Sequence, residues 1–474
     1  MPRADRIRGA WAAGLVVFFV VAVVVEYLFY TFVRSKGVNI TGDEPAYIME
    51  AQALSHGSVH ILPTAVRDLA NGTFRTTYPP GATTRMVEQF GGPQGVVSPF
   101  APGVGALLLV FVAVFGAVKG AVVGALCINT AGLMWLHQRI SRLTGLGPLA
   151  QAVLAVAFAL PPVLIASNQI YPDLPAGILI AIGLVEVAGA ELTGRMSPLT
   201  MVMVTVSAGV SPWLQPKNLV AAAVVMAAFA FVAWRQGAVK GPAVVVGLVL
   251  LSVIAFLLYN HHYYGHWLGL PEPSPKLSRF GAQLTLGLLF DRDMGLFVQV
   301  PWTLIGLAGL VFYGWRRLPA AAVATVVTFV AILVLNGTYT SNPYGGLAPA
   351  GRFMWTLIPI ALPWLALVLA RVQDRRRSML WPLGLAVVAW IWQAEPVFAN
   401  RHQYYNPLVI DYPIWPTWWP KLTRLLPQFG RTSSVLGTHA WALLLELVVE
   451  AVAVAGLLLW LRGPAGRSAA PALP

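Results

Sequence analysis

Charged residues in four short segments have the types needed for acid–base and phosphate chemistry. Gly42-Asp43-Glu44-Pro45 holds two adjacent acids, and Tyr171-Pro172-Asp173 holds a third next to a proline. A carboxylate within hydrogen-bond reach of an alcohol can accept its proton. Lys217, after Trp213-Leu214-Gln215-Pro216, and Arg352, between Gly351 and Phe353, supply cations that can hold a phosphate group. These residue types are the ones that acid–base chemistry and anion binding use.

Each of these signals also has a simpler structural explanation. Asp43, with Pro45 behind it, suits the start of a helix over 48–56, where an acid accepts a backbone N–H and favours the positive helix end. Asp173, flanked by two prolines, suits a helix cap equally. Lys217 and Arg352 are also typical of anchors at a membrane interface. The residues alone leave both explanations open.

Further candidates lie in segments rich in glycine, proline and aromatic residues. Asp291 and Arg292 lie in Gly287–Phe297, and Tyr344 lies in Pro343–Phe353. Irregular backbone at membrane depth is tolerated only where it is buried in protein or lines a cavity, so these segments predict a cavity. Arg292 and Arg401 are weaker candidates for binding the phosphate than Lys217 and Arg352. Tyr404 begins an aromatic stretch that suits either a sugar ring or the membrane interface.

The composition places all these residues in a membrane protein. Of 474 residues, 57% are apolar and only 10% are charged, against roughly 25% charged in soluble domains. Apolar stretches near the length of about 20 residues that crosses a bilayer recur along the chain. The net charge of +13 is expected from cytoplasmic loops that face anionic lipid, so we expect no nucleic-acid partner. The lone Cys127 excludes an intrachain disulfide.

The apolar stretches predict an all-α polytopic fold of about twelve transmembrane helices with juxtamembrane helices on the outer face. A break at Lys119-Gly120 and the charge bias indicate that 101–118 only dips into the interface. We expect the spans at 10–33, 121–137, 149–167, 176–192, 199–213, 219–234, 242–259, 298–315, 320–336, 353–370, 379–394 and 440–461.

The distribution of charge orients these spans in the membrane. Sixteen of the 31 basic residues fall in the N-terminus and the short connectors on one side, which predicts that both termini are cytoplasmic. Eleven of the 18 carboxylates fall on the other side, so we expect the chemistry on the outer face of the cell membrane. We divide the chain into a module over 1–260 with a first outer loop at 34–118, a second module over 261–462, and a disordered tail over 463–474.

Taken in order, the motifs resemble the GT-C polytopic glycosyltransferases, which use sugars carried on polyprenyl phosphate. The similar segments are Gly-Asp-Glu-Pro, Tyr-Pro-Asp-x-Pro-Ala, Pro-Trp-Leu-x-Pro-Lys, Leu-Phe-Asp-Arg-x-x-Gly-Leu and Gly-Gly-x-x-Pro-x-x-Arg-Phe. They run from Asp43 to about Asn406. One departure is Lys217, where the family more often has arginine.

The resemblance implies an inverting transfer to an acceptor hydroxyl on a glycan, lipid or protein. Asp43 would be the general base, with Glu44 and Asp173 orienting the acceptor or the sugar or binding a divalent cation. Lys217 and Arg352 would hold the leaving phosphate. Asp291, Arg292, Tyr344, Arg401 and Tyr404 would add substrate contacts. Metal dependence and the donor sugar stay open.

Two other classes of membrane protein compete with the transferase hypothesis. A transporter or flippase for lipid-linked sugars also suits twelve spans, but such carriers have repeated halves and polar residues near the midplane. Here the halves do not match, and the polar residues collect at the outer ends, with Glu26 and Glu186 as exceptions within spans. A non-catalytic assembly subunit would need none of the three charged residues Asp43, Asp173 and Arg352.

Overall fold

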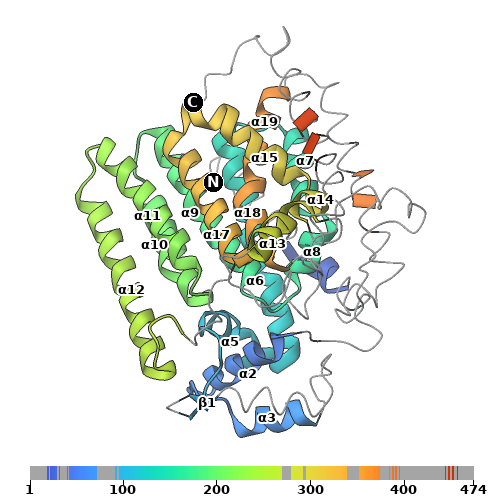
Figure 1. Ribbon diagram of the computed structural model, residues 1–474, viewed down its shortest axis with the longest axis vertical. Coiled ribbons are helices and arrows are strands. Elements are labelled where there is room, and N and C mark those ends of the chain that lie inside the picture. Colours follow the sequence, from blue (N-terminus) through green and yellow to red (C-terminus); the bar gives the residue numbers. More distant parts are fainter. Residues whose placement is uncertain are drawn as a thin grey trace, which may run out of the picture.

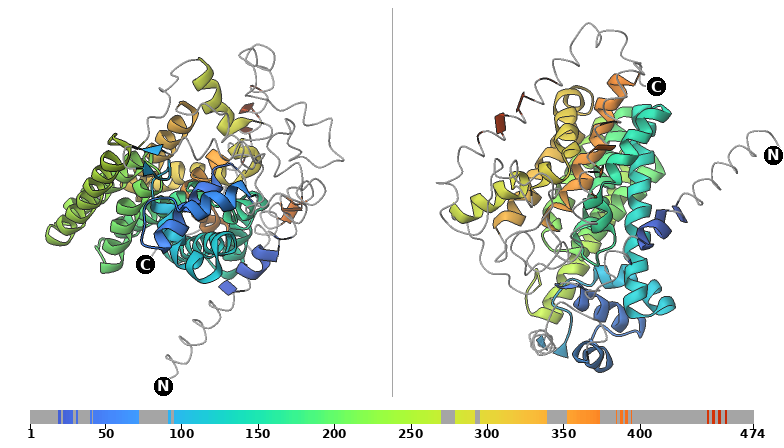
Figure 2. Two further views of the ribbon diagram at one scale, coloured as in Figure 1. Left: turned by 90° about the horizontal axis from the view of Figure 1, so that it is seen from below. Right: turned by 90° about the vertical axis from the view of Figure 1, so that its right-hand side faces the viewer.

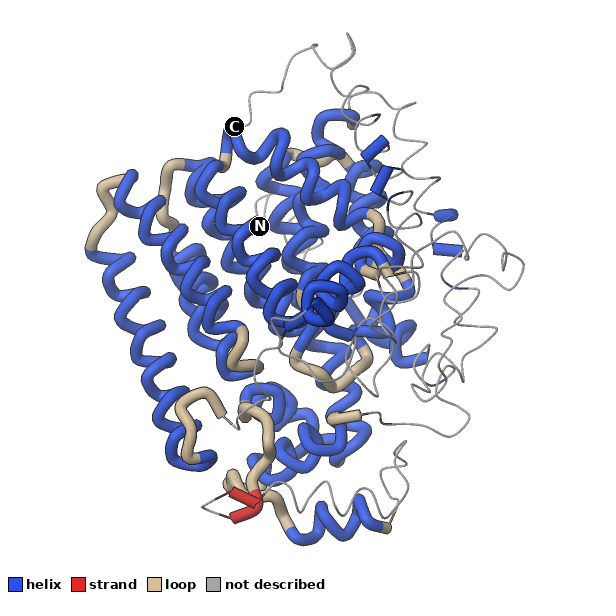
Figure 3. The backbone as a smooth tube through the Cα atoms, in the orientation of Figure 1, coloured by secondary structure: helices blue, strands red, loops and turns tan. Residues whose placement is uncertain are grey.

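The computed structural model describes an all-α helical bundle with one small β-ladder (Figure 1, Figure 3). It describes residues 42–71, 91–92, 95–269, 279–291, 295–338 and 352–373, with short pieces and single residues within 19–40 and 384–456. The predicted helical class is confirmed over this part of the chain.

A group of short elements covers one end of the bundle (Figure 1; Figure 2, right). It consists of α2 (Glu44–Ser55), α3 (Pro63–Ala70), β1 (Gly91–Gly92), β2 (Gly95–Val96) and α5 (Gly103–Phe115). The strands pair antiparallel, with Gly91 opposite Val96. We call this end the Asp43 end, because Asp43 immediately precedes α2.

The rest of the described chain forms the bundle. Its elements are α6 (Ala117–Thr144), α7 (Pro148–Phe158), α8 (Pro161–Ser167), α9 (Asp173–Thr193), α10 (Pro198–Leu214), α11 (Asn218–Arg235), α12 (Lys240–Tyr264), α13 (Arg279–Phe290), α14 (Leu296–Gln299), α15 (Trp302–Gly309), the π-helix η1 (Leu310–Gly314), α16 (Trp315–Arg317), α17 (Pro319–Thr338), the 3₁₀ turn η3 (Arg352–Met354), α18 (Leu357–Ala361), the 3₁₀ turn η4 (Leu362–Trp364) and α19 (Leu365–Val372).

Local sequence explains where several helices begin and end. The Ser197 side chain accepts a hydrogen bond from the Thr200 N–H at 3.0 Å and so caps α10, whose first turn contains Pro198. Gly194 ends α9 in the left-handed conformation with φ of 63°. Proline at position 161 cannot continue α7, and the chain bends by 62° between α7 and α8.

Helix α9 is the centre of the bundle and α12 is at its periphery. α9 packs against α6, α10, α11, α17 and α18, and nearly all of its residues are buried. α12 leaves Val244, Leu251 and Leu258 more than half exposed. An apolar face of this kind fits contact with lipid.

The structure confirms a multi-pass membrane fold and part of the predicted span count. Six helices or helix groups in the described chain are long and apolar enough to cross a membrane: α6, α9, α11, α12, α17 and the segment Arg352–Val372. The bent pair α7–α8 would make a seventh. The predicted spans at 10–33, 379–394 and 440–461 lie largely outside the described residues, so twelve remains a prediction.

Helix α5 corresponds to the segment that we expected to dip into the interface. It has 13 residues, fewer than the about 20 needed to cross a bilayer. Gly116 follows with φ of 82°, a backbone conformation that favours glycine. This break separates α5 from the longer α6 at Gly116. The predicted break at Lys119-Gly120 is wrong in position, because both residues lie within α6.

The acid within α9 has a structural partner. Arg139 Nε and Nη2 donate to Glu186 Oε1 and Oε2 at 2.6 and 2.9 Å, and Thr200 Oγ1 donates to Oε2 at 2.7 Å. Glu186 thus joins α6, α9 and α10. Glu26 accepts a hydrogen bond from Thr130 at 2.8 Å. Both acids make helix-packing contacts.

Candidate active site

One guanidinium brings together the two acids that the sequence singled out. Asp43 precedes α2, Asp173 begins α9, and Arg352 begins η3. Arg352 Nη1 donates to Asp43 Oδ2 at 2.7 Å, and Arg352 Nε donates to Asp173 Oδ2 at 3.0 Å. Three segments far apart in the sequence therefore meet at one point at the Asp43 end.

Asp43 occupies the N-cap position of α2 without using its side chain as a cap. Its side chain makes no capping hydrogen bond, although Pro45 lies in the first turn as expected. The carboxylate faces Arg352 instead, and 31% of the side chain is exposed. The contact to Arg352 thus takes the place of the predicted cap, and the carboxylate stays partly exposed at the surface.

Asp173 has the opposite environment. Its side chain has no exposed surface, and it lies in the first turn of α9, where the helix dipole favours an anion. Lys217 Nζ and Gln215 Nε2 both approach Asp173 Oδ1, at 3.3 and 3.4 Å. The predicted cap is wrong, because Pro172 occupies the cap position and the Asp173 side chain makes no capping hydrogen bond. The carboxylate instead faces the two cations Lys217 and Arg352.

Lys217 is held between the start of α11 and the end of α17. Its Nζ donates to Asn336 Oδ1 at 2.8 Å, and Asn336 Nδ2 donates to the Phe353 carbonyl oxygen at 2.8 Å. The ammonium also lies 5.2 Å from the centre of the Phe353 ring. A cation at this place, 21% exposed, faces Asp173 on one side.

Glu44 joins the first outer segment to the turn before α9. Its side chain is fully buried, and Oε1 accepts a hydrogen bond from the Ile170 N–H at 2.8 Å. This contact holds α2, and with it Asp43, against the loop that presents Asp173. A direct role of Glu44 toward substrate stays a prediction.

Aromatic side chains pack against the Arg352 guanidinium. The Arg352 guanidinium lies 3.9 Å from the centre of the Tyr171 ring, within the range of a cation–π interaction. Tyr171 in turn contacts Trp355 with ring centres 6.1 Å apart. These contacts hold the planar guanidinium in one orientation between Asp43 and Asp173.

A close helix approach positions Arg352 next to α9. A side-chain carbon at Gly177 would collide with the carbonyl oxygen and Cα of Thr356. Glycine at position 177 therefore lets α9 and the segment before α18 touch through their backbones. Arg352 lies only four residues before Thr356, so this contact sets its distance from Asp173.

Two buried groups of α2 extend the site behind Asp43. Tyr47 stacks on Phe100 with ring centres 4.7 Å apart, and burial raises the pKa of its hydroxyl well above its ordinary value. Burial also raises the pKa of Glu50 well above its ordinary value, against the opposing effect of hydrogen bonds from Gly105 and Ser98. Both side chains hold α2 against neighbouring elements by packing.

Sequence analysis missed two polar members of the cluster. Gln215 lies within a motif that we noted for Lys217 alone, and Asn336 lies at the end of an apolar span. Asn336 could have been found from the sequence, because it is an amide at the end of an otherwise apolar span.

The remaining predicted site residues are placed only in part. Asp291 is buried at the end of α13, and its N–H donates to the Gly287 carbonyl oxygen at 2.9 Å. Arg292, Tyr344, Arg401 and Tyr404 lie outside the described residues. The roles of all five toward substrate stay predictions.

Metal binding also stays open. Within the described ranges, no three His, Cys, Asp or Glu side chains gather as a metal site. The cluster itself has two carboxylates, Asp43 and Asp173, each paired with a cation. Its formal charges balance, so an arriving phosphate would have to compete with a carboxylate for Arg352 or Lys217.

Comparisons with known proteins gave similarity at the level of whole structures only. No family model matches the chain, and no curated protein matches it. The crystal structure of ArnT from Cupriavidus metallidurans in the apo state is similar with a TM-score of 0.49 and 18% identity, covering 83% of this chain and 68% of that chain. ArnT bound to undecaprenyl phosphate gives 0.46 and 18%, covering 81% and 65%. Similarity this weak assigns neither a residue role nor an activity to this chain.

Proposed function

We propose that this chain is a membrane glycosyltransferase that moves a sugar from polyprenyl phosphate to an acceptor hydroxyl on the outer face of the cell membrane. The observation that carries the proposal is the shared guanidinium: Arg352 contacts both Asp43 and Asp173 at one end of a membrane bundle. The ordered motifs that resemble the GT-C family support it.

The different exposure of the two acids suggests a division of roles. Asp43 is partly exposed and is the general base. Asp173 is buried and orients the two cations, Arg352 and Lys217, for a phosphate. A fixed cation in a site that excludes water stabilises charge that develops on a leaving oxygen.

In the reaction, the acceptor hydroxyl gives its proton to the Asp43 carboxylate as its oxygen forms a bond to the anomeric carbon of the sugar. The bond from that carbon to the phosphate oxygen breaks, and polyprenyl phosphate leaves with the bonding electron pair. Attack from the face opposite to the phosphate inverts the anomeric centre. Lys217 and Arg352 receive the negative charge of the leaving group.

The buried polar residues of the spans count against a carrier. A carrier needs polar groups near the midplane that are available to a substrate. Glu186 is occupied by Arg139 and Thr200, and Glu26 by Thr130. The cluster of acids and cations around Arg352 lies at the Asp43 end instead.

The test is an assay of the purified protein against a panel of polyprenyl-phosphate sugars, read as release of polyprenyl phosphate with an acceptor mixture present. We expect turnover with at least one donor and a loss of about 10²–10⁴-fold in Asp43→Asn, the typical contribution of a general base.

Asp68→Asn is the matched control, because it makes the same chemical change in α3 at the same end of the bundle. It should keep full turnover. Full turnover in Asp43→Asn would remove the base assignment. If no donor is turned over while vesicles containing the protein move lipid-linked sugars between leaflets, the carrier is the correct class.

A further inference from the structure

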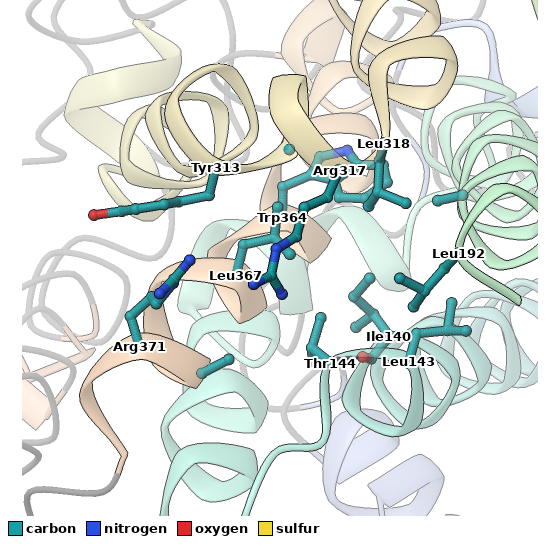
Figure 4. Close-up of a pocket in the computed structure, with 13 residues that line it drawn as sticks. Ile140, Leu143, Thr144, Leu192, Tyr313, Arg317, Leu318, Trp364, Leu367 and Arg371 are labelled. Atoms are coloured by element: carbon teal, nitrogen blue, oxygen red, sulfur yellow. Dashed lines mark hydrogen bonds between the residues drawn. The ribbon is translucent and has the colours of Figure 1, made fainter. Parts of the chain in front are cut away.

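Figure 4 shows a pocket between helices of the bundle. The pocket lies at the end of the bundle opposite to the Asp43 site. Leu192, near the end of α9, is one of its lining residues. It lies nineteen residues after Asp173, about 28 Å along a helix that rises about 1.5 Å per residue. This separation is close to the roughly 30 Å thickness of a bilayer core, so the pocket and the site face opposite leaflets.

The lining of the pocket is mostly apolar. Leu143 of α6, Leu192 of α9 and Leu367 of α19 contribute side chains, and the fully buried Trp364 lies behind them. Figure 4 shows these side chains around one open space between helices from distant parts of the sequence. An open apolar space at the edge of a membrane bundle suits a hydrocarbon chain.

Two arginines give the same pocket a cationic rim. Arg317 of α16 and Arg371 of α19 both line it, and in Figure 4 both guanidinium groups point toward the space between them. Neither arginine takes part in an ion pair of the described chain. Arg371 lies 5.1 Å from the centre of the Tyr313 ring, which holds its side chain beside the pocket.

Other basic residues gather on the same side of the bundle. Arg142, Arg195, Arg235, Lys240 and Arg316 lie at helix ends or connectors opposite to the Asp43 end. Basic pockets between transmembrane helices on the cytoplasmic side bind anionic lipid headgroups. Arg317 and Arg371 differ from these other residues because they border a space with apolar walls.

We propose that this pocket binds one anionic phospholipid of the inner leaflet. Arg317 and Arg371 hold the headgroup phosphate by charge-assisted hydrogen bonds, and an acyl chain lies against Leu143, Leu192 and Leu367. The apolar walls favour an amphiphile over a free anion. The inner leaflet supplies anionic phospholipid at high local concentration. The proposal does not depend on the chemistry at Asp43.

Native mass spectrometry of the purified full chain in detergent tests this site without an activity assay. After exchange into phosphatidylglycerol, phosphatidylcholine or polyprenyl phosphate, we expect one phosphatidylglycerol to be retained at detergent concentrations that remove phosphatidylcholine. In Arg317→Gln/Arg371→Gln the affinity should fall by at least about 100-fold, since two charged hydrogen bonds are lost and each contributes at least about tenfold.

Arg235→Gln/Arg316→Gln is the matched control, because it removes the same charge at the same end of the bundle without changing the lining of the pocket. It should retain phosphatidylglycerol as the wild type does. If the first double variant does not fold, Leu367→Trp fills the pocket and keeps both arginines, and it should also release the lipid.

Three results would overturn the proposal. Equal retention of phosphatidylglycerol and phosphatidylcholine would remove the role of the headgroup charge. Equal losses in the two double variants would indicate a general effect of net charge. Preferential retention of polyprenyl phosphate, or stabilisation by millimolar inorganic phosphate alone, would assign the pocket to a different ligand.

Discussion

Asp173→Asn should destabilise the protein far more than Asp43→Asn, although each change removes one carboxylate that pairs with Arg352. Asp173 has no exposed side-chain surface and faces Arg352 at 3.0 Å and Lys217 at 3.3 Å. Removing one partner of a buried pair costs about 3–5 kcal/mol, because the remaining charge is left uncompensated. Asp43 is 31% exposed, and an exposed pair contributes about 0–1 kcal/mol. The two variants should therefore differ by about 2–5 kcal/mol.

Thermal or denaturant unfolding in matched micelles measures this difference. A third variant, Asp173→Asn/Lys217→Met, also removes the surplus positive charge and should regain part of the lost stability. The reasoning is refuted if Asp43→Asn and Asp173→Asn have the same midpoint, or if the double variant is no more stable than Asp173→Asn alone. In the transferase assay Asp43→Asn should be folded yet nearly inactive, which separates the base from the buried acid.

Three more predictions follow from contacts at the Asp43 end. Gly177→Ala should lower the free energy of unfolding by about 1–3 kcal/mol and reduce turnover, because the added Cβ collides with Thr356. Gly247→Ala is the control, because the space around its Cβ is open. Equal unfolding midpoints of the two variants would contradict the close approach of the helices. Lys217→Met should lower kcat/KM for the donor by about 10–150-fold, because one charged hydrogen bond to the phosphate is lost. Lys217→Arg should keep most of the activity. Unaffected kinetics in Lys217→Met would exclude a phosphate contact. Glu50→Gln should be more stable than the wild type at neutral pH.

The pH dependence behind the Glu50 prediction has a definite sign. Burial raises the pKa of Glu50 above its ordinary value of 4.5, so the folded protein binds this proton more tightly than the unfolded chain. Its contribution to stability is complete below pH 4.5 and is lost as the pH rises through the folded-state pKa. Glu50→Gln removes this loss, so the two unfolding midpoints should diverge as the pH rises. Parallel curves of unfolding midpoint against pH for the two proteins would contradict the raised pKa of Glu50.

The sequence predicted the members of the charged cluster because each lies in an unusual place. Asp43, Asp173 and Arg352 are ionisable residues beside prolines or glycines at the ends of apolar stretches, where charge is costly without a purpose. Charge bias then placed these ends on one face. Lys217 was found by the same reasoning.

Other contacts had no local sign in the sequence. Asn336 meets Lys217 across 119 residues, and Arg139 meets Glu186 across 47. Such pairs depend on how helices pack, which periodicity does not report. The bend between α7 and α8 and the π-helix η1 were likewise missed, because an apolar stretch reads the same whether it is straight or broken. The predicted span at 298–315 overlaps four successive helical pieces, α14, α15, η1 and α16.

The long reach of Arg352 sets an order of events while the chain is being made. It pairs with acids that precede it by 309 and 179 residues, so at roughly 5–20 residues per second Asp173 is synthesised about 10–35 s before this arginine. Lys217 arrives only 44 residues after Asp173 and is the earliest cation available to it. A nascent chain that stops between residues 173 and 352 thus contains both acids but lacks the guanidinium that pairs with them. An incomplete protein therefore cannot assemble the charged cluster prematurely.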